Sequence, residues 1–312
     1  MTARTFGAVI AVLLGCTRAN LDVIQRATAD AGIDADASGA SSDGSVATCP
    51  LPSLNSGDMT RTVHVGSSSR SYVLHLPAAY DGSKAAPLIV DFHANGGSGS
   101  LERSTSLYPA VTDAEGVVMA FPTGLSGPLG AAWNVGPCCV ADVDDVAFSR
   151  ALVADVKTIA CIDAKHIYAT GALTGGGMAY YLGCNAADVF AAIAAASFDL
   201  FEENVADCKP SRPISVISFR GTAEQLVPYA GGPSSFVPGM PVTFLGAQAT
   251  FQQWAELDQC TGSASSADGN GCSSYAGCQA GVEVILCTKQ GGGDDMGNAA
   301  VAWPVLKRHR LP

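Results

Sequence analysis

Short apolar runs alternate with amphipathic stretches along most of the chain. The runs are rich in Val, Ile, Leu, Phe and Ala, which is typical of strands buried on both faces of a parallel sheet. We predict five such strands, over residues 87–92, 117–121, 166–171, 213–219 and 282–287. Upstream of them, residues 62–66 and 71–77 have polar edges and β-branched residues and predict a β pair.

Helical patterns lie between these runs. We predict a helix that ends at Ala160 and is capped by Asp144 or Asp145, and further helices over residues 176–184, 247–257 and 299–308. Alternating β and α units predict an α/β fold with a mostly parallel central sheet and helices on both faces.

The first 48 residues have a different character. A basic start is followed by an apolar run over residues 5–14, which is too short to span a bilayer and has the layout of an export signal. The run ends in Leu13-Leu14-Gly15-Cys16, which resembles a bacterial lipoprotein signal and implies cleavage after residue 15 and acylation of Cys16; an ordinary secretory signal is the alternative. Residues 16–48 are rich in Ala, Asp, Ser and Gly and predict a disordered tether, so the folded domain is expected over 49–312.

Composition narrows the function classes. The formal net charge is −11 and only 14% of the residues are charged. An acidic chain repels phosphate backbones, so we expect no nucleic-acid partner. Eleven cysteines indicate export to an oxidising compartment. We expect a monomer without a cofactor or metal. It is expected either to be held at the cell envelope, with its lipid anchor as the only membrane contact, or to be secreted.

Several separated motifs follow the predicted strands in a characteristic order. They are the segments 91–99, 122–124, 133–139, 144–148, 171–178, 219–224, 227–229 and 291–295. Together they resemble the secreted α/β-hydrolase esterases of the polyhydroxybutyrate depolymerase and feruloyl esterase type, over residues 60–309. The resemblance implies an α/β-hydrolase fold and the hydrolysis of polyesters or aromatic esters by a Ser-His-Asp triad.

The chain departs from this family at the triad positions. The nucleophile motif Gly-x-Ser-x-Gly lies over Gly171–Gly175 and has Leu173 where the serine belongs. The acid position falls on Glu224, and the histidine position falls on Asp294. Leucine cannot attack a carbonyl group, and an aspartate is a poor proton shuttle at neutral pH.

Other residues of the expected site come from the loops. The resemblance assigns His93 to the oxyanion loop, where we expect it to position the loop, and the backbone N–H groups of Ala94, Asn95 and Thr174 are candidate oxyanion donors. Trp133 is a candidate ligand contact at the cleft. Structural or surface roles are expected for the remaining histidines, which are His64, His75, His166 and His309.

Three functional interpretations remain. The first is a degenerate esterase, a pseudoenzyme at the cell surface retained for binding a ligand or partner such as an ester, a polyester or a polysaccharide-linked group. The second is an active ester hydrolase with a rearranged nucleophile, Thr174 or Ser197. The third is a calcium-type oxygen site formed by Glu224, Asp294 and Asp295, which no EF-hand spacing supports.

Without Cys16, ten cysteines remain, an even set that allows up to five disulfides. They are Cys49, Cys138, Cys139, Cys161, Cys184, Cys208, Cys260, Cys272, Cys278 and Cys287. The adjacent Cys138 and Cys139 are expected to bond to different partners.

Overall fold

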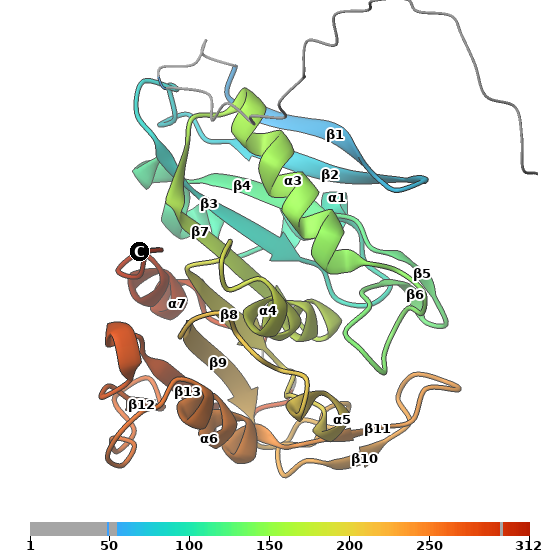
Figure 1. Ribbon diagram of the computed structural model, residues 1–312, viewed down its shortest axis with the longest axis vertical. Coiled ribbons are helices and arrows are strands. Elements are labelled where there is room, and N and C mark those ends of the chain that lie inside the picture. The colour runs from blue at the N-terminus through green and yellow to red at the C-terminus, as the bar shows by residue number, and fades with distance from the viewer. Residues whose placement is uncertain (1–48, 50–54, 294–295) are drawn as a thin grey trace, which may run out of the picture. The chain divides into compact units, whose positions relative to one another are not determined.

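A mostly parallel sheet forms the centre of the computed structural model, which describes Cys49 and residues 55–293 and 296–312 (Figure 1). Its strand order is β1-β2-β4-β3-β7-β8-β9-β13-β12. The pairs β1/β2, β2/β4 and β12/β13 are antiparallel, whereas the neighbours from β4 to β13 are parallel. The strands are β1 (Gly57–Val65), β2 (Ser68–Leu76), β3 (Ala86–Phe92), β4 (Val118–Pro122), β7 (Ile162–Ala172), β8 (Ala192–Ala196), β9 (Ser215–Gly221), β12 (Cys272–Tyr275) and β13 (Val284–Lys289).

Helices cover both faces of this sheet. Helices α3 (Asp145–Ile159), α4 (Thr174–Asn185) and α6 (Ala247–Leu257) lie in front of it in Figure 1 and enclose the larger apolar core. Helix α7 (Ala299–Leu306) and the segment with α1 (Gly99–Thr105) and α2 (Pro109–Thr112) pack on the opposite face over a second core. The predicted fold class is confirmed.

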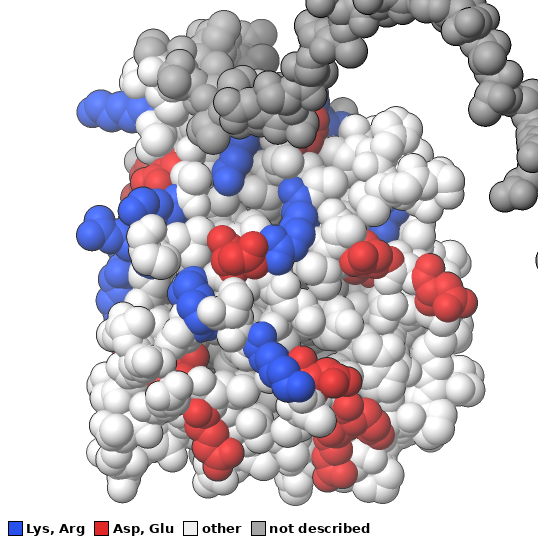
Figure 2. Space-filling view, in the orientation of Figure 1, with Lys and Arg blue, Asp and Glu red and all other residues white. Residues whose placement is uncertain are grey.

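The remaining elements are short. They are the hairpins of β5 (Leu125–Gly127) with β6 (Gly130–Ala132) and of β10 (Gly232–Ser234) with β11 (Val242–Phe244), helix α5 (Glu202–Val205), and the 3₁₀ turns Asp113–Glu115 and Gln279–Gly281. In the view of Figure 2, basic and acidic side chains are interspersed over the face that carries α3, α4 and α6. None of the helices that the structure describes has the length and apolarity to cross a bilayer.

Most predicted elements are present with small shifts of their ends. Helix α6 has the expected bounds, Asp144 caps α3 by accepting a hydrogen bond from the Ala147 N–H, and α4 begins at Thr174 rather than at residue 176. Strand β8 was not predicted. Its sequence, Ala-Ile-Ala-Ala-Ala, favours a helix locally. Pairing with β7 and β9 on its two sides makes it a central strand instead.

Five disulfides connect the ten cysteines that the structure describes, Cys49–Cys161, Cys138–Cys139, Cys184–Cys208, Cys260–Cys278 and Cys272–Cys287. They indicate export to an oxidising compartment. The expectation for Cys138 and Cys139 is wrong, because these neighbours are bonded to each other across a cis peptide bond that brings their Cα atoms to 3.1 Å. Cys16, the expected signal over 1–15 and the tether over 16–48 lie outside the described residues.

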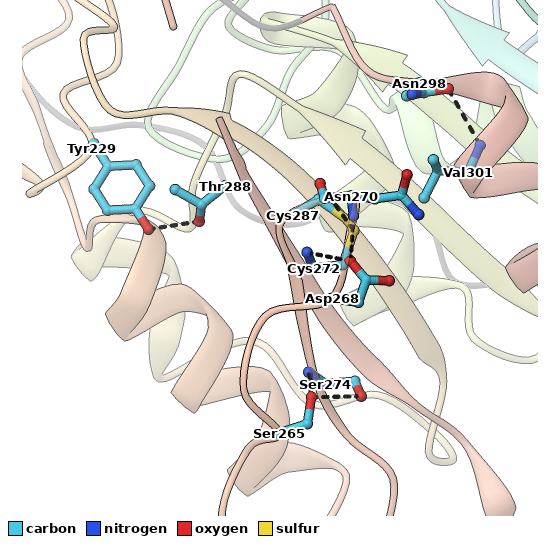
Figure 3. Close-up of a disulfide and its surroundings, with 10 residues drawn as sticks. All are labelled: Tyr229, Ser265, Asp268, Asn270, Cys272, Ser274, Cys287, Thr288, Asn298 and Val301. Carbon is cyan, nitrogen blue, oxygen red and sulfur yellow. Dashed lines mark hydrogen bonds between the residues drawn. A yellow bond between two sulfur atoms is a disulfide. The ribbon is translucent and has the colours of Figure 1, made fainter. Parts of the chain in front are cut away.

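The last disulfide holds the sheet edge together. Cys272 of β12 is bonded to Cys287 of β13, and Asp268 accepts hydrogen bonds from the N–H groups of Cys272 and Asn270 at 2.9 and 2.8 Å (Figure 3). The Tyr229 hydroxyl lies 2.8 Å from Thr288 Oγ1, on the residue after Cys287. This edge is thereby fixed by a covalent bond as well as by the strand pairing.

Candidate functional site

A sharp turn joins β7 to α4 at the centre of the sheet. Its apex is Leu173, whose backbone has a φ of 50° and a ψ of −125°. A non-glycine residue is uncommon in this region, and such strain is characteristic of functional sites. The Leu173 N–H donates to the Ala196 carbonyl at 2.9 Å, and the Gly177 N–H donates to the Leu173 carbonyl at 2.9 Å, so both sides of the turn are held.

The glycines that flank the apex make this turn sterically possible. A Cβ on Gly171 would lie 2.5 Å from the Gly175 carbonyl carbon, and a Cβ on Gly175 would collide with the Phe92 carbonyl oxygen. The backbone of Gly171–Gly175 therefore has the form of a nucleophile elbow, although its apex carries a partly exposed leucine.

Thr174 follows the apex but is unsuited to act as a nucleophile. Its side chain is fully buried, and its Oγ1 has no hydrogen-bond partner among the residues that the structure describes. A hydroxyl group needs an adjacent base and access to the substrate. Its backbone N–H is at the first position of α4, and the first hydrogen bond at this end of the helix comes from the Gly177 N–H. The Thr174 N–H therefore has no acceptor within the helix, which is compatible with the expected role of an oxyanion donor.

The loop after β3 is held by the side chain of His93. Its Nδ1–H donates to the Ala94 carbonyl at 2.6 Å, and its Nε2 accepts from the Gly124 N–H at 2.9 Å. Both ring nitrogens are therefore used by the backbone. Burial lowers the pKa of this imidazole, which keeps it neutral. His93 positions the loop that carries Ala94 and Asn95, and it has no nitrogen left for proton transfer at the elbow.

Trp133 does not line a cleft, in contrast to the expectation. The indole is fully buried and packs against Phe92 and His93, with ring centroids 5.0 and 4.8 Å apart. Its Nε1–H donates to the His93 carbonyl at 2.9 Å. Trp133 therefore supports the loop after β3 from inside the core, because its indole N–H is the hydrogen-bond donor for the His93 carbonyl and its ring shields that carbonyl from water.

Glu224, which the resemblance assigns to the acid position, follows β9 in the chain, and both of its carboxylate oxygens accept hydrogen bonds. Oε1 accepts from the Gly221 N–H at 2.6 Å and from the Ser197 hydroxyl at 3.2 Å. Oε2 accepts from the Arg220 guanidinium at 3.0–3.1 Å. The carboxylate thus has a permanent cationic partner within the core.

Arg220 also forms an ion pair with Asp199, so three buried charged side chains form one cluster. Burial opposes the charge of Arg220, but Asp199 and Glu224 outweigh it and raise its pKa above the ordinary value. Burial raises the pKa of Asp199 to about 6, against the lowering effect of Arg220. Sequence reasoning missed this cluster. The signal was one arginine within the apolar run of β9, because a buried charge requires a counter-ion.

Ser197, the other alternative nucleophile, is fully buried and donates to Glu224. The structure describes all five histidines. His75 contacts Asp58 and Asp113, His166 contacts Asp163, and His309 contacts Glu283, while His64 is exposed on β1. Asp294 and Asp295 lie outside the described residues, and within the described ones no group of three His, Cys, Asp or Glu side chains could hold a metal ion.

A small cavity of about 140 Å³ lies beside α4, one turn beyond the apex. Its walls include Gly136, Gly177, Tyr181, Phe198 and Asn204. Ligand pockets commonly enclose about 300–1,000 Å³. This cavity therefore fits only a small group of a ligand.

Comparison with known proteins gives the context of this site. No family model matches the chain. The chain is 44% identical over 246 residues to feruloyl esterase B of Piromyces equi, which covers 78% of this chain and 46% of that protein. It is 31% identical over 171 residues to feruloyl esterase C of Emericella nidulans, and this match covers 53% of this chain and 58% of that protein. The chain spans about half the length of these curated relatives.

Solved structures show the same architecture. An acetyl xylan esterase from Aspergillus awamori superposes with a TM-score of 0.60 at 11% identity, over 80% of this chain and 99% of that one. A feruloyl esterase module from Clostridium thermocellum, complexed with sinapinate, gives 0.51 at 15% identity, over 81% and 86%. The chain has the α/β-hydrolase fold. Together with the sequence similarity, this fold supports an esterase-type hydrolase ancestry.

Proposed function

We propose that this protein is a catalytically silent relative of the feruloyl esterases, which binds an aromatic ester or a polysaccharide-linked ester without cleaving it. The observation that carries the proposal is Leu173 at the apex of an intact elbow. Leu173 has the strained, positive-φ backbone conformation that presents a nucleophile in this fold. Its side chain, however, has no atom that can attack a carbonyl group.

Two polar side chains of the described site are also engaged elsewhere. The ring nitrogens of His93 are both bonded to the backbone, and Glu224 is bound to Arg220 rather than free to orient a histidine. Removing the nucleophile from a serine hydrolase lowers kcat by about 10⁶, and the oxyanion hole and binding leave roughly 10³ to 10⁴ over water. The retained features thus favour ligand binding over turnover.

An active esterase with a rearranged nucleophile is the second candidate. Thr174 and Ser197 are both fully buried, so an ester carbonyl could reach either of them only after a rearrangement of the backbone. A fluorophosphonate probe tests this candidate directly. Covalent labelling of the folded protein at either residue would support it.

The decisive experiment compares the purified chain with two reversion variants. The assays are hydrolysis of methyl ferulate and p-nitrophenyl acetate, and binding of methyl ferulate followed by calorimetry. We expect the natural chain and Leu173→Ser to bind the ester but to show no more than residual hydrolysis. The double variant Leu173→Ser/Asp294→His should hydrolyse it at least 100-fold faster than the natural chain, because it regains both a nucleophile and a base.

Two results would contradict the proposal. The first is efficient turnover by the natural chain that survives repurification and is lost in Leu173→Ala. The second is the absence of any binding of methyl ferulate to a chain with a cooperative unfolding transition. Leu182→Met, a conservative change buried in α4, is the matched control and should leave both binding and hydrolysis unchanged.

The cellular location belongs to the same proposal. The motif Leu13-Leu14-Gly15-Cys16 supports attachment of the chain to the cell envelope through acylated Cys16. We expect a labelled fatty acid to be incorporated into the natural chain during expression in a bacterium and not into Cys16→Ser. Equal labelling of the two would exclude the anchor and leave secretion.

A further inference from the structure

A second cavity lies on the face of the sheet that α7 covers, away from α4. It has a volume of about 320 Å³ and lies between the C-terminal halves of β7 and β8, the N-terminus of α7 and the segment after α1. The alternation of side chains along the strands turns Ala172, Ala194 and Ala196 toward it, on the same face as the second apolar core. These alanines are too small to fill the space, which explains the cavity.

The cavity opens between exposed apolar side chains. Leu107 is 53% exposed and Met296 is 54% exposed, and both line its walls. They are two of the four large hydrophobic side chains that stand out on the described surface, and a third, Leu101, lies on the neighbouring α1. Exposed apolar side chains gathered around a concave site are typical of ligand binding.

The polar wall of the cavity is acidic. Asp91 is only 3% exposed, and its carboxyl oxygens accept hydrogen bonds from the hydroxyls of Ser106 at 2.6 Å and Thr170 at 2.7 Å. No Lys, Arg or His occurs among the described lining residues. Asp91 is therefore a buried carboxyl group at a cavity wall whose protein partners are all neutral.

Glu102 of α1 lies on the same wall. Its carboxyl group has no hydrogen-bond partner among the residues that the structure describes. Burial and the nearby Asp91 raise the pKa of Glu102 to about 8. Two carboxyl groups that share a site raise each other's pKa, and a cation placed between them would relieve their repulsion. The acidic wall therefore favours a cationic ligand over a neutral or anionic one.

We propose that this cavity binds a small organic ammonium ion, with the ammonium group between Asp91 and Glu102 and an apolar body of one ring or a short chain against Ala194, Ala196 and Phe219. The volume is at the lower end of the range of ligand pockets, about 300–1,000 Å³, which limits the ligand to this size. Leu173 and Glu224 do not line this cavity, so the proposal is independent of the function proposed for the elbow.

Calorimetric titration of the full exported chain at pH 7 tests the proposal, with 2-phenylethylammonium chloride as the probe and 2-phenylethanol as its neutral counterpart. We expect the ammonium ion to bind at least tenfold more tightly than the alcohol. Glu102→Gln should weaken ammonium binding at least fivefold and leave the weak binding of the alcohol unchanged. Asp91→Asn should weaken ammonium binding further, since it removes the more deeply buried charge.

A matched control separates this effect from a general loss of negative charge. Glu115 is an exposed carboxylate that pairs with Lys307 at 2.9 Å, and Glu115→Gln should leave ammonium binding within twofold of the natural chain. Thermal unfolding of each variant checks that it is folded, and Glu102→Gln keeps the test valid if Asp91→Asn does not fold. Equal binding of the two probes, no binding of either, or ammonium binding unaffected by Glu102→Gln would each overturn the proposal.

Discussion

Two buried carboxyl groups, one within a central strand and one just after another, have opposite surroundings. Glu224, after β9, is 7% exposed and bonded to the guanidinium of Arg220, whereas Asp91, within β3, is 3% exposed and bonded only to two hydroxyls. The first charge is neutralised within the protein, and the second is not. The residue that resembles a catalytic acid has thus become part of a closed structural cluster, while an acid outside the triad faces an open cavity.

The largest effect is expected from removing the cation of the closed cluster. Arg220→Met leaves Asp199 and Glu224 buried without a cationic partner, and breaking a buried ion pair in this way costs about 3–5 kcal/mol. Urea unfolding of the oxidised protein measures the loss. The control is Arg150→Met, which removes an exposed pair with Asp188 and should cost less than about 1 kcal/mol.

The same cluster offers a rescue variant. Arg220→Met/Asp199→Asn/Glu224→Gln removes all three charges and should recover most of the lost free energy of unfolding, since an uncharged set avoids the desolvation penalty. If the single and triple variants are equally unstable, the packing of Arg220 and not its charge holds the cluster.

The next effect concerns Glu102 and depends on pH. Its pKa is about 8 in the folded chain, against an ordinary value of 4.5, because of burial and Asp91. A raised carboxyl pKa lowers the free energy of unfolding at high pH, and this penalty disappears as the pH falls through 8 toward 4.5. At pH 8.5, the free energy of unfolding of Glu102→Gln should exceed that of the natural chain by about 1–2 kcal/mol. A fully buried carboxylate would give a larger difference, but Glu102 is partly exposed and solvent screens its charge.

The check is a series of urea unfolding curves between pH 4.5 and pH 8.5. The stability difference between Glu102→Gln and the natural chain should vanish at the acidic end. A constant difference across the range would show that ionisation of Glu102 is not involved.

A smaller effect is expected for Asp91→Asn. The substitution removes a buried charge, whose burial raises the pKa of Asp91, but it also weakens the hydrogen bonds from Ser106 and Thr170. These changes oppose each other, so the free energy of unfolding should stay within about 1 kcal/mol of the natural chain. Thermal unfolding at pH 7 measures it, and a loss as large as that of Arg220→Met would remove the contrast between the two acids.

The smallest effect sets the baseline for both sites. Glu115→Gln removes an exposed ion pair with Lys307 and should change the stability by less than about 0.5 kcal/mol. The same unfolding assay tests it, in low and high salt. A larger loss would mean that charge pairs at this surface contribute more than the comparison assumes.

The order of strands and helices could be predicted from the sequence because it depends on short-range patterns. Apolar runs, capping residues such as Asp144 and the glycines around the elbow are local signals, and the structure follows them closely. Strand β8 could not be predicted in this way. Its alanines favour a helix, and only the two neighbouring strands decide its conformation.

The candidate site divides along the same line. The spacing of the motifs in the sequence was enough to place a leucine at the apex of the turn and to assign the acid position to a glutamate. Only the tertiary structure decided what those residues contact. Arg220 closes on Glu224, Trp133 turns into the core, and Cys138 bonds to Cys139. Charge neutralisation, burial and the choice of disulfide partner depend on which atoms are near one another in space, and no local pattern in the chain encodes that proximity.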